Sequence, residues 1–180
     1  KEILKKFNEY NCDLLIGAEL NCFPDRLCRN YELKFLDTNS KYNYPNGGTY
    51  IGYAHAIMKM LNWKPKSEQK IMCKKHGDQA YLSEYYLANA SDKILLDKHC
   101  RVFQNMHMVP LQDFEIKDNR VYNKVLQTFP CFVHFNGGVT VTNDGKNLME
   151  IFVNKMKAGE GDFKECKQLI TDTCYPISQV

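Results

Sequence analysis

Residues 129–138 of this chain, Phe-Pro-Cys-Phe-Val-His-Phe-Asn-Gly-Gly, carry the pattern on which the interpretation of its fold depends. An apolar run typical of a strand ends at His134, and a small, flexible Asn-Gly-Gly turn follows at once. Neutral imidazole is a common ligand of divalent transition metals, and glycine lets the backbone approach a bound ligand closely. Two interpretations of His134 stay open, a metal ligand and a histidine satisfied within the core.

Outward from this segment, short apolar runs alternate with stretches of helical spacing, which predicts an α/β fold. The lysine-rich stretch 64–75 is interpreted as a connector, and residues 21–46 as an ordered surface loop. We expect strands at 13–19, 49–53, 94–96 and 101–105, a hairpin over 114–122 and a strand ending at His134, with helices at 1–7, 54–63, 80–89, 146–156 and 163–170.

Polar groups follow several of the predicted strands, where α/β sheets usually bind their ligands. Four candidates share this position: Glu19, the run Asn46-Gly47-Gly48, Asp78, and His134 with its glycine turn. Each has a simpler explanation as well. Asp78 suits a helix N-cap, the glycine run suits a tight turn, and Glu19 suits a strand end in solvent. Their common location favours a functional site.

Composition limits the function classes. The chain has 180 residues, of which 44% are hydrophobic, as in a globular domain of ordinary size. The net charge of +3 is spread along the chain and interleaved with acids, which predicts neither a nucleic-acid partner nor a membrane surface. No apolar run is long enough to span a membrane.

The eight cysteines contain no Cys-x-x-Cys pair, so a zinc ribbon or a thioredoxin-like site is not expected. Cys12, Cys100 and Cys131 lie in or beside apolar segments, as core thiols do. Cys22 with Cys28, or Cys166 with Cys174, could form disulfides in an oxidising compartment, and the spacing alone does not establish that either forms.

Read in order, these segments resemble the glycosyltransferase domain of the procollagen lysyl hydroxylase family. The order and rough spacing of the matching stretches agree from Lys1 to about Gly138. The stretches are Glu2–Phe7, Leu14–Glu19 with Cys22–Asp25, Asn46–Ala54, Asp78–Tyr81, Leu96–Asp97 with Arg101–Asn105, and Val133–Gly137.

The resemblance implies a GT-A (Rossmann-like) fold, Mn²⁺ as cofactor, and retaining transfer of glucose from UDP-glucose to galactosylhydroxylysine in a collagen-like polypeptide. It makes His134 a metal ligand and brings Asn136 and Gly137 to the diphosphate. Asp78, with Gln79 beside it, would lie at the donor sugar and acceptor, as the catalytic carboxylate. Asn46, Gly47 and Gly48 would line the sugar pocket, and Glu19 and Cys22 would border the acceptor.

In the family, an Asp-rich metal motif and the first uridine-binding strand precede the segments matched here. We therefore expect residues 1–145 to be the C-terminal portion of the domain, with the N-terminal nucleotide-binding strands missing from this chain, and residues 146–180 to be a helical extension. Giant-virus relatives would suit the Lys- and Asn-rich composition.

The expected location is the endoplasmic reticulum and secretory pathway or, for a viral protein, the host cell or virion. A homodimer is one assembly that this interpretation allows. Two alternative functions stay open: a hydroxylysine galactosyltransferase, and a non-catalytic GT-A-like module that binds collagen or glycans.

Overall fold

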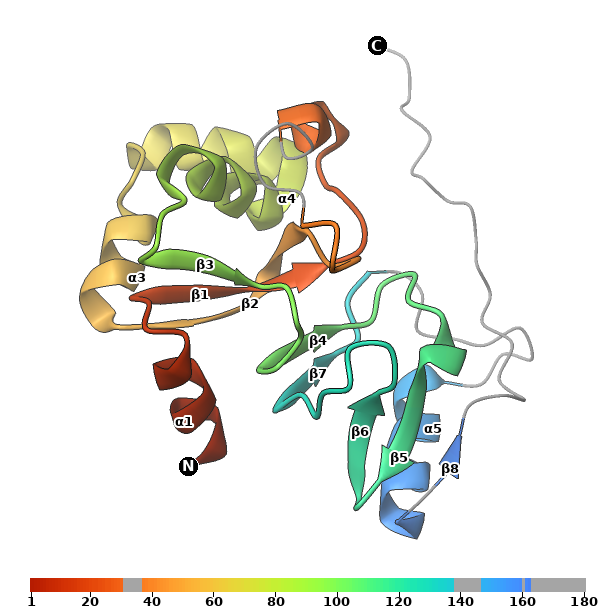
Figure 1. The fold of residues 1–180 in the computed structure, drawn as a ribbon. Coiled ribbons are helices and arrows are strands. Elements are labelled where there is room, and N and C mark those ends of the chain that lie inside the picture. Colours follow the sequence, from red (N-terminus) through yellow and green to blue (C-terminus); the bar gives the residue numbers. More distant parts are fainter. Residues whose placement is uncertain (31–36, 138–146, 160, 163–180) are drawn as a thin grey trace.

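The computed structural model describes residues 1–30, 37–137, 147–159 and 161–162, which form three small sheets with helices packed around them (Figure 1). This arrangement confirms the predicted α/β class. Residues 163–170, for which a helix is predicted, lie outside the described residues. No helix among the described residues is both long and apolar enough to cross a membrane.

The first sheet has the order β2-β1-β3 and is built around a completely buried central strand. Strand β1 (Leu14–Glu19) pairs antiparallel with β2 (Tyr44–Gly52) and parallel with β3 (Ile94–Asp97). Its side chains alternate between two hydrophobic clusters, so that Leu14 and Ile16 join one and Leu15 the other. Burial of both faces explains why this strand reads as a continuous apolar run.

Helices cover this sheet (Figure 1). Helix α1 (Glu2–Glu9) buries Phe7 in the same cluster as Leu15, and α3 (Ala54–Leu61) buries Ala56 and Met60 in the other. Both helices were expected from their apolar spacing. The third, α4 (Lys66–Asn89), includes the segment predicted as a connector.

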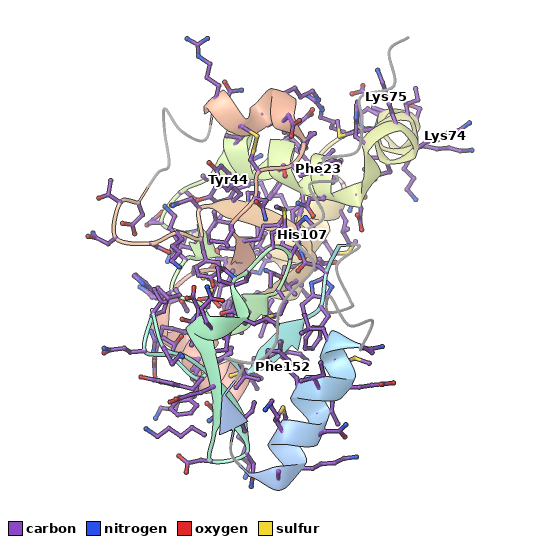
Figure 2. All side chains as sticks on the ribbon, turned by 90° about the vertical axis from the view of Figure 1, so that its right-hand side faces the viewer. Phe23, Tyr44, Lys74, Lys75, His107 and Phe152 are labelled. Atoms are coloured by element: carbon purple, nitrogen blue, oxygen red, sulfur yellow. A yellow bond between two sulfur atoms is a disulfide. The ribbon has the colours of Figure 1, made fainter. Side chains whose placement is uncertain are left out.

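The connector prediction for residues 64–75 is therefore wrong from Lys66 onward. Gly77, with φ 76° and ψ 171°, interrupts α4 and separates a mostly exposed first part from a second part that buries Tyr81, Tyr85 and their neighbours. The lysine-rich part has no apolar stripe to reveal it, yet Lys, Glu, Gln and Met are good helix formers. Figure 2 shows Lys74 and Lys75 pointing away from the body of the protein.

The second sheet is a parallel pair, β4 (Phe103–Asn105) and β7 (Phe132–His134), in which Asn105 lies opposite His134. Strand β4 lies next to β1, so the C-terminal ends of β1, β4 and β7 come close together. A parallel pairing needs a long connection, and here residues 106–131 supply it. The strand predicted to end at His134 is confirmed.

The connection contains the third sheet, of order β6-β5-β8. The predicted hairpin is confirmed: β5 (Phe114–Lys117) and β6 (Arg120–Asn123) are joined through Asp118 and Asn119, both at positive φ as in a two-residue hairpin turn. Helix α5 (Leu148–Ala158) packs on this sheet with Phe152 against Phe114. The remaining elements are two 3₁₀ turns, η1 (Asp25–Leu27) and η2 (Leu111–Asp113), and the short strand β8 (Gly161–Asp162).

Candidate functional site

The side chain of Glu19, at the C-terminal end of β1, is the centre of a buried polar cluster. Only 2% of this residue is exposed, and three side-chain amides donate hydrogen bonds to its carboxylate. Asn136 Nδ2 lies 2.7 Å and Asn46 Nδ2 3.3 Å from Oε2, while Gln79 Nε2 donates to Oε1. These partners come from β2, from α4 and from the turn after β7, so one carboxylate joins three distant parts of the chain.

Burial raises the pKa of Glu19 to about 7, and the three amide donors reduce that increase. Desolvation disfavours the charged carboxylate, whereas hydrogen bonds donated to it favour the charge. The carboxyl group therefore changes its charge near neutral pH, as groups at functional sites often do.

The run Asn46-Gly47-Gly48 lies within β2 and not in a separate turn, which corrects the prediction. Ile16 pairs with Tyr50 but Ala18 pairs with Pro45, so four residues of β2 bulge opposite Gly17. The Asn46 side chain supports the bulge by accepting a hydrogen bond from the Gly48 N–H at 2.9 Å. A bulge next to a site re-aims side chains, and here it directs Asn46 at Glu19.

Both glycines of the run allow close approach by site residues. A Cβ on Gly47 would lie 2.8 Å from the Cα of Gln79, and a Cβ on Gly48 would lie 2.3 Å from Cε1 of His134. Any residue larger than glycine at either position would collide with these atoms. Gly47 thus brings α4 onto β2, and Gly48 leaves room for the imidazole ring.

The tautomer of His134 is fixed by a buried amide. Asn105 Nδ2 donates to the carbonyl of Ala18 at 2.9 Å, which leaves Asn105 Oδ1 facing His134 Nδ1 at 3.0 Å. An acceptor at that distance requires Nδ1 to carry the proton, so Nε2 keeps its lone pair. Burial also lowers the pKa of His134, which favours the neutral ring. This is the arrangement in which a histidine can bind a metal through Nε2.

Asn136, which follows β7, connects the segment after β4 to Glu19. Its Oδ1 accepts hydrogen bonds from the backbone N–H groups of Met106 at 2.9 Å and His107 at 3.0 Å, while its Nδ2 donates to Glu19. The side-chain oxygen is therefore fully engaged within the protein. The neighbouring Gly137, at φ 76°, approaches the ring of His107 so closely that a Cβ would lie 2.1 Å from Nδ1.

Two residues of the cluster were not among the predicted site residues, Asn105 and His107. Figure 2 shows His107 near the middle of the molecule, and its buried Nδ1 has no hydrogen-bond partner among the described residues. Asn105 ends a predicted strand, so the same rule that selected Glu19 and His134 could have found it. His107 lies in an irregular segment and carries no comparable signal.

Of the predicted residues, Glu19, Asn46, Gly47, Gly48, Gln79, His134, Asn136 and Gly137 belong to or border the cluster. Asp78 is exposed beside Gln79, and its carboxylate accepts from the Gln79 N–H at 2.9 Å. Cys22 forms a disulfide with Cys28, with an S–S distance of 2.08 Å, which confirms that one of the two possible disulfides forms. The other possible pair, Cys166 and Cys174, lies outside the described residues.

The cluster supplies one good nitrogen ligand for a metal ion, and the described residues do not complete a site. Within the described ranges, no three His, Cys, Asp or Glu side chains come close enough together to hold an ion. His134 Nε2 could serve as one ligand of a divalent transition metal.

A buried titratable carboxylate, two histidines and several amides at converging strand ends are typical of a ligand-binding α/β domain. The family follows from the sequence: the model of the PLOD GT domain matches residues 1–157, and the chain belongs to this family. The resemblance stated from the motifs is thereby confirmed.

Three relatives illustrate the match. Uncharacterized protein R699 of Acanthamoeba polyphaga mimivirus is 30% identical over 139 residues, covering 76% of this chain and 28% of that protein. Procollagen-lysine,2-oxoglutarate 5-dioxygenase 1 of Mus musculus is 28% identical over 144 residues, with 76% and 18% covered. The multifunctional procollagen lysine hydroxylase and glycosyltransferase LH3 of Rattus norvegicus is 30% identical over 144 residues, with the same coverage. The chain thus spans 18–28% of the length of these relatives.

Proposed function

We propose that this chain is part of a retaining, Mn²⁺-dependent glycosyltransferase of the GT-A type that transfers glucose from UDP-glucose to galactosylhydroxylysine in a collagen-like polypeptide. The observation that carries the proposal is convergence. Residues taken from four separate family motifs, Glu19, Asn46, Gln79 and Asn136, meet around one buried carboxylate. Membership of the PLOD GT domain family supports the same reaction class.

His134 is the metal ligand in this proposal. A divalent metal at this position would neutralise the negative charge that develops on the diphosphate leaving group. The protein's contribution is to present Nε2 with its lone pair free, because Asn105 holds the proton on Nδ1. Gly137 would bring its backbone toward the diphosphate, while Asn136, whose oxygen is engaged, holds that backbone in place.

The carboxylates take different roles. Asp78 is exposed at the end of the break in α4, where it could stabilise oxocarbenium-like positive charge or accept the proton of the acceptor hydroxyl. Glu19 is buried and borders the acceptor side through its amide partners. Asn46, Gly47 and Gly48 line the sugar pocket. The Cys22–Cys28 disulfide supports the loop beside the acceptor, and it fits the secretory pathway or the surface of a virion.

The proposal is tested with the full protein, UDP-glucose, Mn²⁺ and a galactosylated collagen peptide, with glucosylated peptide detected by mass spectrometry. His134→Ala should abolish Mn²⁺-dependent transfer and leave the circular dichroism spectrum unchanged. His99→Ala, at an exposed histidine away from the cluster, is the matched control and should retain activity. Full activity in His134→Ala would refute the ligand assignment.

Two alternatives are separated by the same assay. A donor panel that yields product only from UDP-galactose on unglycosylated hydroxylysine would indicate a galactosyltransferase. A non-catalytic module is favoured by one observation, that the described residues hold no cluster of three metal ligands. Binding of the collagen peptide with neither transfer nor hydrolysis of any UDP-sugar would identify such a module.

A further inference from the structure

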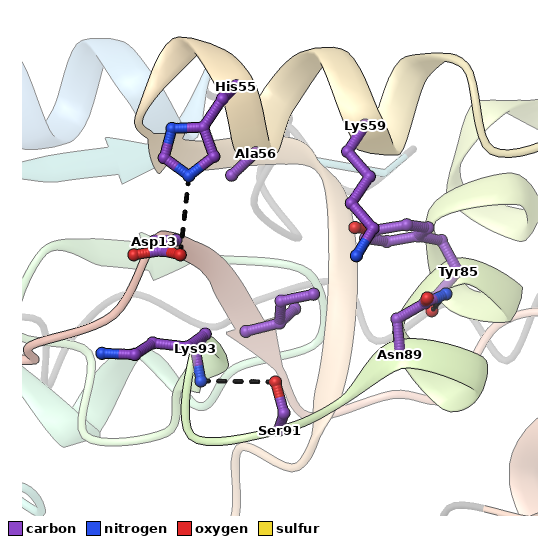
Figure 3. Close-up of a pocket in the computed structure, with 9 residues that line it drawn as sticks. Asp13, His55, Ala56, Lys59, Tyr85, Asn89, Ser91 and Lys93 are labelled. Atoms are coloured by element: carbon purple, nitrogen blue, oxygen red, sulfur yellow. Dashed lines mark hydrogen bonds and ion pairs between the residues drawn. The ribbon is translucent and has the colours of Figure 1, made fainter.

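A pocket of about 340 Å³ opens at the end of the first sheet opposite to the Glu19 cluster (Figure 3). Asp13, which lines it, immediately precedes β1, whereas Glu19 ends that strand. Five residues of extended chain lie between them, which places the two side chains about 20 Å apart along the strand. The volume lies in the range of small-molecule sites. The lining residues are Asp13, His55, Ala56, Lys59, Tyr85, Asn89, Ser91, Lys93 and Ile94.

The hydroxyl group of Tyr85 is the feature that points to a ligand. Tyr85 is completely buried, and its Oη has no hydrogen-bond partner among the described residues. A buried polar atom without a partner destabilises the fold, so such atoms need an explanation. Figure 3 shows the ring lying along the pocket with its hydroxyl end toward Lys59. Burial raises the pKa of Tyr85, so the hydroxyl keeps its proton and can donate a hydrogen bond.

Among the charged residues that line the pocket, Lys59 is the cation that lies beside Tyr85 (Figure 3). The carboxylate of Asp13 lies 3.5 Å from His55 Nε2 at the pocket. Lys59 makes no ion pair within the described part of the chain, and Lys93 reaches only the carbonyl of Asn11, at 3.5 Å. The ammonium group of Lys59 and the hydroxyl of Tyr85 therefore lie at a space whose wall includes the buried Ala56 and Ile94, whereas Lys93 points away from it (Figure 3).

We propose that this pocket binds a small organic anion, with its carboxylate or phosphate group held by Tyr85 Oη and Lys59 Nζ and its apolar part on Ala56 and Ile94. This binding site is separate from the cluster around Glu19. It does not depend on the proposed transferase reaction, so either proposal can fail without the other.

The test uses two anionic probes and one neutral probe of similar shape: benzoate, phenyl phosphate and benzyl alcohol. Binding to the full protein is measured by isothermal titration calorimetry. At least one anion should bind in the millimolar range or tighter, and benzyl alcohol should bind at least about tenfold more weakly, because a hydrogen bond to a charged group is worth about 1.5–3 kcal/mol. Preference for benzoate or phenyl phosphate identifies a carboxylate or a phosphate ligand.

Tyr85→Phe is the decisive variant because it removes only the hydroxyl and keeps the ring that packs against Trp63. It should weaken anion binding about tenfold or more without lowering the melting temperature, because no hydrogen bond within the protein is lost. Lys59→Met should weaken binding to a similar extent. Lys70→Met, at an exposed lysine of α4, and His134→Ala should bind the anion as the unmodified protein does.

Three results would overturn the proposal. One is that neither anion binds the full protein at millimolar concentration. Another is that benzyl alcohol binds as well as the anions. The third is equal anion affinity in Tyr85→Phe and the unmodified protein.

Discussion

Replacing Glu19 with glutamine should change how the stability of the fold depends on pH. Burial raises the pKa of this carboxyl from 4.5 to about 7 in the folded protein. The folded state therefore holds the proton more tightly than the unfolded chain does. The stability that this proton provides is complete below pH 4.5 and is lost as the pH rises through 7.

The size of the effect follows from the two pKa values. A shift of one unit corresponds to about 1.4 kcal/mol, so ionisation of Glu19 costs the fold about 3 kcal/mol at pH 8 and about 1 kcal/mol at pH 5. Glu19→Gln has no such ionisation. It also weakens the hydrogen bonds from Asn46, Gln79 and Asn136, but that loss is the same at every pH.

The assay is urea unfolding of both proteins at pH 5, 6, 7 and 8, followed by circular dichroism. The free energy of unfolding of Glu19→Gln minus that of the unmodified protein should rise by about 2 kcal/mol from pH 5 to pH 8. Titrations common to both proteins cancel in this difference. Glu68→Gln, which removes an exposed carboxylate of α4, is measured alongside as the matched control variant.

A flat difference for Glu19→Gln across this range would refute the reasoning. It would mean that the three amide donors compensate the burial of the charge completely. A difference that falls with pH would mean that the donors overcompensate and that the carboxylate stabilises the fold when ionised.

Three further predictions concern the surroundings of the site. Gly48→Ala should displace the His134 ring and abolish the proposed transferase activity, at a stability cost of about 1–3 kcal/mol. Gly77→Ala, which has open space for its Cβ, should lower the melting temperature slightly and leave that activity intact. Asn105→Ala leaves the His134 Nδ1–H without its acceptor. It should therefore lower the free energy of unfolding, measured in urea, by about 2–4 kcal/mol. A loss under about 1 kcal/mol would contradict the hydrogen-bond assignment. Cys28→Ser removes the disulfide and should lower the free energy of unfolding by about 2 kcal/mol. Dithiothreitol should destabilise the unmodified protein and leave the stability of Cys28→Ser unchanged.

Strand ends were the part of the site that the sequence could reveal. A buried strand is recognisable from its apolar run, and the group that follows it is then fixed in position, as Glu19 and His134 show. Asn105 obeys the same rule and was missed because an amide at a strand end suggests no chemistry by itself. Its importance lies in the hydrogen bond to His134, which depends on pairing across 29 residues.

The bulge in β2 could not be predicted, because it depends on a partner strand. The sequence shows Asn46-Gly47-Gly48 as turn-forming residues, and a turn is the usual outcome. In the structure Gly17 of the opposite strand leaves space for Thr49, since a Cβ there would lie 2.0 Å from its Oγ1. The bulge in β2 thus depends on Gly17 in β1, which the sequence of β2 alone does not show.

The first part of α4 was missed because it buries little of its surface against the rest of the protein. From Lys66 to Gly77 nearly every residue is exposed, including Ile71 at 69%. Hydrophobic periodicity detects a helix by the face that it buries, so it is uninformative for a solvated helix. Intrinsic propensity was the better signal for this segment.

The parallel register that places Asn105 opposite His134 has a consequence for how this family can vary in length. Side chains of a strand alternate between its two faces, so deleting one residue before His134 within the strand would turn the imidazole away from Asn105. Substitutions in the neighbouring loops leave this alternation intact, whereas a one-residue insertion or deletion inside either strand reverses it. Insertions and deletions should therefore accumulate in the long connection between the two strands and be excluded from the strands themselves.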